Sequence, residues 1–219
     1  MSFEGPEIRD YENVVSLNLA WLDCLRNDRA AAAGLPPSPA PLRERLTALE
    51  RPEAARLAES PFLLFSFRER DDRYWDQVLA RQSAQDLFGS AAGGEVATLA
   101  NAALGFIWQL ANRNPYALRI FCGASLFWCE RIAELTFYRL LEAVTATGDV
   151  PVLRLADNHA MWQKLLHEGL SRDAGIRHAA QFAAMQTVLT GSGRDGERES
   201  WSRAARSLQA PGRRVADDR

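Results

Sequence analysis

Residues 116–144, YALRIFCGASLFWCERIAELTFYRLLEAV, decide the fold that the sequence predicts. Small residues at 123–125 let helix backbones approach closely, and apolar residues recur at helical spacing on both sides of Glu134 and Leu135. Thr136 stands where an N-cap residue would begin the last helix. We expect two helices joined by a short turn, with a third helix ahead of them. A helix-turn-helix DNA reader has this arrangement, and so does an antiparallel helix pair in an ordinary bundle.

Composition is that of an ordinary globular protein. Of 219 residues, 47% are hydrophobic and 25% are charged. No apolar run approaches the roughly 20 residues that a membrane helix needs, and the acidic first ten residues lack the pattern of a signal peptide. Three cysteines are a sparse, odd set. We expect a reduced, cytoplasmic protein with no membrane partner and no cofactor.

The net charge of −2 is unevenly distributed. Residues 1–112 carry 11 basic and 16 acidic side chains, residues 113–190 carry 8 and 7, and residues 191–219 carry 7 and 5. Arginine supplies every basic residue except Lys164, a bias that a GC-rich genome produces as readily as phosphate binding does. The slightly positive charge of the second half is therefore compatible with contact to nucleic acid, but it does not by itself indicate such contact.

Apolar residues at three- and four-residue steps predict helices along most of the chain. Proline and glycine mark a loop at 27–41 and a link at 88–94. The tail at 191–219 has the composition of a disordered segment, although Trp201 and Leu208 are candidates for docking. Helices are expected at 9–27, 42–49, 52–58, 73–87, 95–112, within 115–146, and at 158–170 and 173–189.

The stretch FLLFSFR, residues 62–68, is the one convincing strand. A strand needs a partner, and the sequence shows no second one, so we expect a second copy of the chain to supply it. The alternative is an extended buried segment. The expected dimer contacts are Phe62, Leu64, Phe65 and Phe67.

Two stretches resemble the FlhD subunit of the bacterial flagellar master regulator: SLNLAWL at 16–22 and the segment 42–68. That subunit has a Leu-Asn-Leu segment, a Leu-Ala-x-Leu helix, a proline-led helix ending in Leu-Ala-Glu, and a strand ending in Phe-Arg. Residues 103–112 are compatible with a later helix of that subunit. The matching residues from the second stretch are Leu46, Ala48, Leu49, Pro52, Leu57, Ala58, Glu59, Leu63, Phe67 and Arg68.

The opening stretch resembles the partner subunit, FlhC. FlhC has a Gly-Ala-Arg-Leu segment, a glutamate, Leu-Ser, and a basic helix containing Arg-Leu-Leu or Arg-Leu-Ile. Both resemblances together cover roughly residues 14–189. The matching residues are Gly123-Ala124-Ser125-Leu126, Glu130, Leu135-Thr136 and Arg139-Leu140-Leu141, followed by Pro151 and Trp162.

The resemblance implies a mainly α fold: a helical bundle with one short strand at a dimer interface. It implies an FlhD-like dimerisation region at 1–112, an FlhC-like helix-turn-helix region at 113–190 and the tail at 191–219. The implied function is that of a DNA-binding transcriptional activator in flagellum biogenesis. Its implied partners are promoter DNA, further copies of the chain (a dimer or higher) and RNA polymerase or another regulator. The residues expected to face DNA are Arg119, Ser125, Arg131, Thr136, Tyr138 and Arg139, with Leu140, Leu141 and Val144 holding the helix to the body.

Three departures from the family limit what the resemblance implies, and the weak basic charge of residues 136–146 favours an alternative function. FlhD often has a cysteine in its strand where this chain has Phe65. The four-cysteine zinc site of FlhC is missing, since no cysteine follows Cys129. Phe137 and Glu142 stand where the family tends to have basic residues, and phosphate contacts supply much of DNA affinity. The alternative is an oligomeric interaction protein that does not bind DNA and modulates a transcriptional regulator.

No group of residues predicts catalysis or a metal site, so we expect no enzyme. The histidines are not spaced one helical turn apart, and no HExxH pattern occurs. Cys122 and Cys129 are expected to be small core residues. The acidic cluster of Glu69, Asp71 and Asp72 is expected to be a solvated turn. The histidines are His159, His167 and His178.

Overall fold

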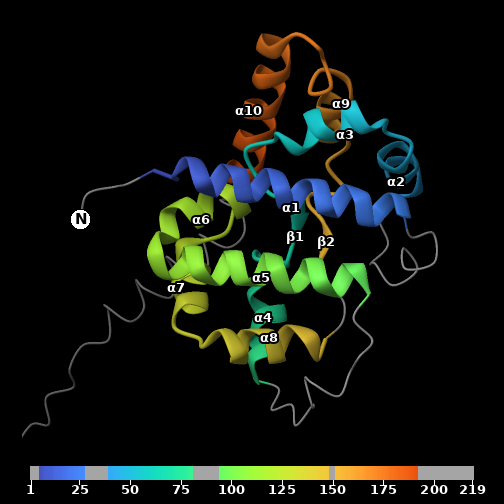
Figure 1. Ribbon diagram of the computed structural model, residues 1–219. Helices are drawn as coiled ribbons and strands as arrows, with labels where there is room; N and C mark the ends of the chain where they lie inside the picture. Colours follow the sequence, from blue (N-terminus) through green and yellow to red (C-terminus); the bar gives the residue numbers. More distant parts are fainter. Residues whose placement is uncertain (1–4, 28–38, 81–93, 148–150, 192–219) are drawn as a thin grey trace, which may run out of the picture.

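The computed structural model describes residues 5–27, 39–80, 94–147 and 151–191. Within these residues the chain forms ten helices and one two-stranded sheet, which confirms the mainly helical fold (Figure 1). The expected loop at 27–41, link at 88–94 and tail at 191–219 lie largely outside the described residues. The elements are α1 (Ile8–Asn27), α2 (Ala40–Thr47), α3 (Arg51–Ala58), β1 (Phe65–Ser66), α4 (Asp72–Ala80), α5 (Glu95–Arg113), α6 (Pro115–Cys122), α7 (Leu126–Ala133), α8 (Phe137–Thr145), β2 (Val152–Leu153), α9 (His159–His167) and α10 (Ala174–Thr190).

Polar side chains begin the helices of the second half. Each caps its helix by accepting a hydrogen bond from a backbone N–H of the first turn, which would otherwise lack a partner. The predicted cap at Thr136 is confirmed: its Oγ1 accepts from the Arg139 N–H at 3.2 Å. The capping residues of α6 to α10 are Asn114, Ser125, Thr136, Asn158 and Asp173.

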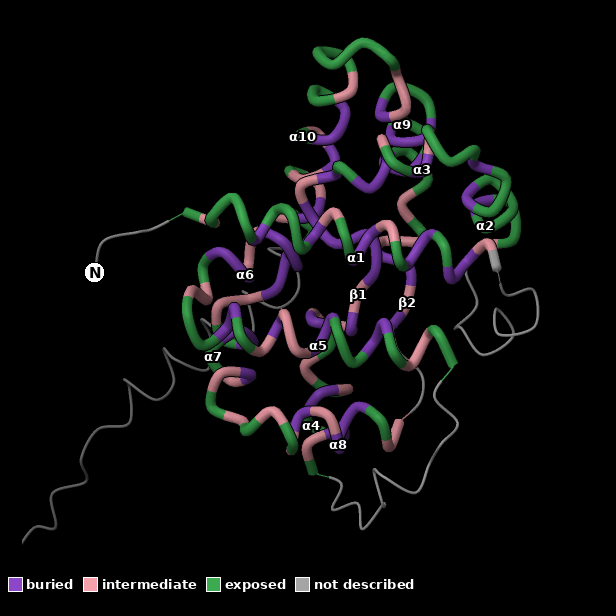
Figure 2. The backbone as a smooth tube through the Cα atoms, viewed as in Figure 1, coloured by how far each residue is buried: buried purple, intermediate pink, exposed green. Residues whose placement is uncertain are grey.

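The helices are arranged around α1, which crosses the middle of Figure 1. It packs against α2 and α3 on one side and against α5 on the other. In this view α9 and α10 lie on the side of α2 and α3, while α4, α7 and α8 lie beyond α5. Buried residues lie on the inner faces of these helices (Figure 2), and their side chains form one continuous core. That core crosses the expected domain boundary at 112, since Leu110 and Ala111 belong to it together with Ala117 and Leu118.

The expected pairing of the strand with a second copy is wrong. β1 pairs with β2 of the same chain in an antiparallel register that places Phe65 opposite Leu153. Phe62, Leu64, Phe65 and Phe67 are 0% exposed, so the protomer's own core buries the side chains expected at a dimer interface. β2 is only two residues long, too short for an alternating pattern to show in the sequence. Oligomerisation through another surface stays a prediction.

A buried asparagine fixes the segment that leads into β1. Asn18 of α1 is 0% exposed, and its Nδ2 donates to the carbonyls of Ala58 at 3.2 Å and Phe62 at 2.9 Å. Its Oδ1 accepts from the Leu64 N–H at 2.9 Å. The asparagine of the Leu-Asn-Leu stretch thus supplies hydrogen bonds to backbone that no regular element satisfies.

None of the described helices combines the length and the apolar character needed to span a membrane.

Candidate interaction site on the helical hairpin

Helices α7 and α8 and the turn at 134–136 form the predicted helical pair, which we call the α7–α8 hairpin (residues 125–145). The side-chain hydroxyls of Ser125 and Thr136 cap the N-terminal ends of α7 and α8. Ser125 Oγ accepts from the Trp128 N–H at 3.1 Å, as Thr136 does for α8. Both residues were expected to face DNA, and the structure gives each a structural role. Ser125 and Thr136 lie beyond opposite ends of α7, whose eight residues give a helix length of about 12 Å.

Trp108 of α5 holds the turn in place. Its Nε1 donates to the Leu135 carbonyl at 2.7 Å, and its ring lies 5.8 Å from the ring of Phe137, measured between centroids. The orientation of the hairpin is therefore fixed by a long neighbouring helix. The sequence stretch alone does not contain this constraint.

The inner face of α8 packs into the core as predicted. Leu140 is 0% exposed and Val144 is 5% exposed, while Leu141 is partly buried against the same core. On α7, Cys129 and Ile132 are fully buried. The expectation that Leu140, Leu141 and Val144 hold α8 to the body is confirmed.

Both arginines of the hairpin are engaged within the chain. Arg131 Nη1 lies 2.7 Å from Asp76 Oδ1 of α4. Arg139 Nη1 lies 2.7 Å from Glu142 Oε2, and its Nη2 donates to the Leu79 carbonyl at 3.3 Å. Glu142 is only 9% exposed, so the positive charge of Arg139 compensates the negative charge of a nearly buried carboxylate.

The outer surface of the hairpin is aromatic and weakly acidic. Phe127 and Tyr138 are each 55% exposed. Residues 125–145 contain two arginines and three glutamates, a formal charge of −1. Arg119 is partly buried in the last turn of α6, where its charge acts on the Cys129 thiol. The six residues expected at DNA thus do not form one basic face.

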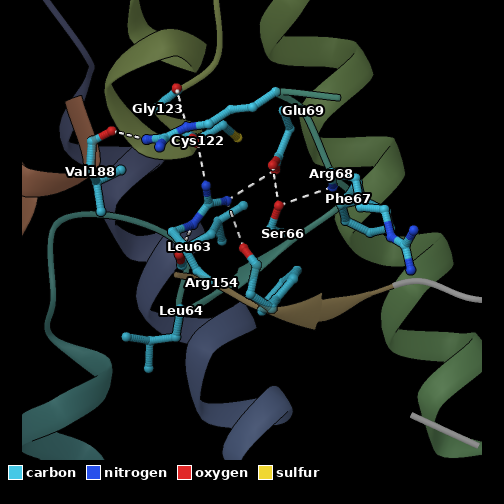
Figure 3. A network of polar contacts seen from close by, with 12 residues as sticks. Leu63, Leu64, Ser66, Phe67, Arg68, Glu69, Cys122, Gly123, Arg154 and Val188 are labelled. Atoms are coloured by element: carbon cyan, nitrogen blue, oxygen red, sulfur yellow. Dashed lines mark hydrogen bonds and ion pairs between the residues drawn. The ribbon is translucent and has the colours of Figure 1, made fainter. Parts of the chain in front are cut away.

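A second polar group, missed by the sequence reasoning, lies in the core around Arg154 (Figure 3). This side chain follows β2 and is 3% exposed. Its Nε donates to the Leu63 carbonyl at 2.5 Å and its Nη2 to the Phe65 carbonyl at 2.6 Å, while Nη1 donates to the Cys122 carbonyl. Nη2 also pairs with Glu69 Oε1 at 3.0 Å. One guanidinium therefore joins β1, β2 and the end of α6.

The expectation of a solvated acidic turn is wrong for Glu69, which is 1% exposed. Its second oxygen accepts from the Ser66 hydroxyl, which in turn accepts from the Arg68 N–H at 2.9 Å. Nearby, Arg70 donates to the carbonyls of Gly123 and Val188. Burial and the charge of Arg154 lower the pKa of Arg70. An arginine inside the apolar run at 151–155 was the one sequence signal for this group.

The cysteines are core residues, as expected. Burial raises the pKa of Cys122 well above its ordinary value, and burial first, with Glu69 second, raises the pKa of Cys129 to about 12. Both thiols stay protonated near neutral pH, which removes the thiolate that a nucleophile or a metal ligand needs. The three histidines are exposed, and no group of three or more potential metal ligands occurs in the part of the chain that the structure describes.

Comparison of the chain with protein-family models, with curated proteins and with solved structures finds no match. Membership of the flagellar activator family therefore stays a prediction from the residues quoted above.

Proposed function

We propose that this protein acts in transcriptional regulation by binding a protein partner, itself a regulator, through the α7–α8 hairpin. One observation carries the proposal. The hairpin holds both of its arginines in contacts within the chain and presents two aromatic side chains to solvent. The family resemblance supplies the regulatory context.

Electrostatics disfavours tight DNA binding by this surface. Affinity for a duplex comes largely from cations that displace counterions from phosphates. The hairpin has a formal charge of −1, and turning Arg139 toward a phosphate would leave the nearly buried Glu142 without its partner. Uncompensated charges in such positions are costly.

Aromatic side chains suit a protein interface. Such interfaces gain most of their free energy from a few anchors, among which Trp, Tyr and Arg are enriched. Burying an exposed phenylalanine fully is worth about 1.5–3 kcal/mol. Phe127 and Tyr138, each more than half exposed, are the anchors that the hairpin offers. The expected partner surface is an apolar groove with polar edges.

The test captures partners of the immobilised full-length protein from a nuclease-treated lysate, and then measures the affinity of the purified partner. Phe127→Ser and Tyr138→Ser should each weaken binding about tenfold, or roughly 1.4 kcal/mol. Ile8→Ser is the matched control, because Ile8 is an exposed apolar residue on α1, outside the hairpin. If the wild type, Phe127→Ser, Tyr138→Ser and Ile8→Ser all bind the partner with equal affinity, the proposal is overturned.

Direct DNA binding is the second candidate. The observation in its favour is the three-residue turn that leads into α8, with Thr136 and Tyr138 exposed at the start of that helix. Recognition helices contact bases with residues near their N-terminus. The Arg131–Asp76 pair is partly exposed, with side chains 25% and 59% exposed, and such a pair is worth only about 0–1 kcal/mol. Arg131 can therefore be redirected to a phosphate at little cost.

A salt titration separates the two candidates. Fluorescence anisotropy with a labelled promoter duplex should show weak binding that Arg139→Gln and Tyr138→Ser do not change. Tight, salt-sensitive binding that both variants lose and Ile8→Ser keeps would establish DNA as the ligand and overturn the protein-binding proposal.

A further inference from the structure

The exposed residues of α10 include His178 but no aspartate, glutamate, lysine or arginine. We use the name α10 outer face for the solvent-facing residues of α10 that are named at the end of this paragraph. Ile176 is 49% exposed and Phe182 is 56% exposed. Surface helices ordinarily present charged residues to water, and large apolar side chains exposed on one helix face mark a docking surface. The members are Ile176, Ala179, Phe182, Ala183, Gln186 and Thr190.

Contacts on the opposite face of α10 prevent it from rotating to bury these residues. Ala180, Ala184 and Val188 are buried in the interior. Gln181 Nε2 donates to the Arg56 carbonyl at 2.9 Å, and Arg177 Nε pairs with Glu59 Oε2 at 3.0 Å. The α10 outer face is thus held outward by hydrogen bonds and packing.

The chain beyond α10 contains a stripe that matches this face. The structure describes residues up to Gly191, directly after α10. In the following sequence Trp201, Ala204, Ala205 and Leu208 are spaced i, i+3, i+4 and i+7, the pattern of one apolar helix face. Residues 192–200, SGRDGERES, have no bulky apolar side chain and connect the stripe to α10.

The connecting segment is long enough for the stripe to reach the α10 outer face. Nine residues span up to about 30 Å, and a helix of 17 residues is about 25 Å long. A short covalent connection gives an effective concentration on the order of millimolar. A segment of the same chain therefore has an advantage over a second copy, which must associate from solution.

We propose that residues 201–208 of the same chain dock on the α10 outer face, with Trp201 and Leu208 as the anchors. This proposal is independent of the function of the hairpin. Docking covers Ile176 and Phe182 and gives the tail a fixed attachment beside α10.

The test places a bimane fluorophore on the face and uses quenching by Trp201 as a contact signal. Gln186→Cys provides an exposed attachment site, and the native cysteines are buried and stay unlabelled in the folded protein. In the full-length chain, Trp201→Phe should relieve quenching by removing the quencher. Leu208→Asp should relieve it by undocking the segment. Val215→Ala, in the same tail but outside the stripe, should leave the emission unchanged.

Two results would overturn the proposal. One is an emission that Trp201→Phe does not change. The other is quenching only when labelled Trp201→Phe protein is mixed with unlabelled chains that retain Trp201, which would make a second copy the occupant. A label at Gln163→Cys on α9, an exposed position off the face, controls for quenching by the tryptophans of the core.

Discussion

Arg154 and Glu69 form an ion pair inside the core: Nη2 lies 3.0 Å from Oε1, and the two side chains are 3% and 1% exposed. The arginine also donates to three backbone carbonyls, those of Leu63, Phe65 and Cys122. The group joins segments that lie 32 to 91 residues from Arg154 along the sequence. Each partner is needed to compensate the charge of the other.

Arg154→Met should therefore be among the most destabilising single changes. It removes the guanidinium that is ion-paired with the buried Glu69 carboxylate and that donates to three carbonyls. Breaking a buried pair from one side costs about 3–5 kcal/mol. Urea unfolding followed by circular dichroism measures the loss of the free energy of unfolding.

Two further variants give this prediction its controls. Arg45→Met changes an exposed arginine of α2 and should shift the unfolding free energy by less than about 0.5 kcal/mol. Glu69→Gln keeps an acceptor for the guanidinium while removing the charge, and should cost less than Arg154→Met. Equal stability of Arg154→Met and Arg45→Met would contradict a stabilising role for the pair.

Gly123→Ala should destabilise the link between α6 and α7. Gly123 has a φ of +62°, and a Cβ there would lie 2.6 Å from both Cγ1 and the carbonyl oxygen of Val188. The left-handed conformation alone costs an alanine about 1–2 kcal/mol, and the overlap with backbone adds to it. The unfolding free energy should fall by at least that amount. Gly5→Ala, where a Cβ meets nothing within 4 Å, should have no measurable effect.

Local signals predicted most of the helices. Thr136 is visible as a cap because the hydroxyl and the N–H it bonds lie three residues apart. Apolar spacing placed 95–112 within one residue of the observed end of α5. The contacts that determine these helices join residues only a few positions apart, so a short stretch of sequence contains both partners.

Long-range polar contacts could not be predicted in the same way. Phe65 and Leu153 pair across 88 residues, and each strand contributes only two residues to the sheet. Arg131 and Arg139 looked like exposed cations because Asp76 and Leu79 lie on a distant helix. A sequence shows that an arginine is present but does not show which carbonyl or carboxylate it meets.

Alkaline pH should weaken the fold through Cys129. The folded-state pKa of about 12 is above the ordinary value of 9.0, so below pH 9 the thiol is protonated in both states and stability is unaffected. Between pH 9 and about 12 the unfolded chain loses the proton while the folded chain keeps it. Stability then falls by about 1.4 kcal/mol per pH unit for this thiol.

Urea unfolding at a series of pH values, in the wild type and Cys129→Ala, measures this contribution. The comparison uses the slope against pH, because the substitution also changes packing at all pH values. Cys129→Ala should have the shallower slope above pH 9. Parallel slopes would show that the thiol ionises in the folded state as readily as in the unfolded state.

Trp108→Phe should loosen the turn of the α7–α8 hairpin while leaving the core packed. The substitution keeps an aromatic ring beside Phe137, but it makes the ring smaller and removes the Nε1–H that donates to the Leu135 carbonyl at 2.7 Å. The lost hydrogen bond is worth about 1 kcal/mol. Amide hydrogen exchange should therefore accelerate about fivefold at residues 134–140, where opening depends on the turn.

The matched control is Gln109→Ala, an exposed position on the same helix, which should leave exchange in the turn unchanged. Exchange in α1 reports on global stability and should change less than exchange in the turn. If the hairpin binds its partner as a preformed unit, Trp108→Phe should also weaken that binding although Trp108 does not belong to the proposed contact surface. Unchanged exchange at 134–140 would mean that packing of Leu140 and Val144 alone holds the hairpin.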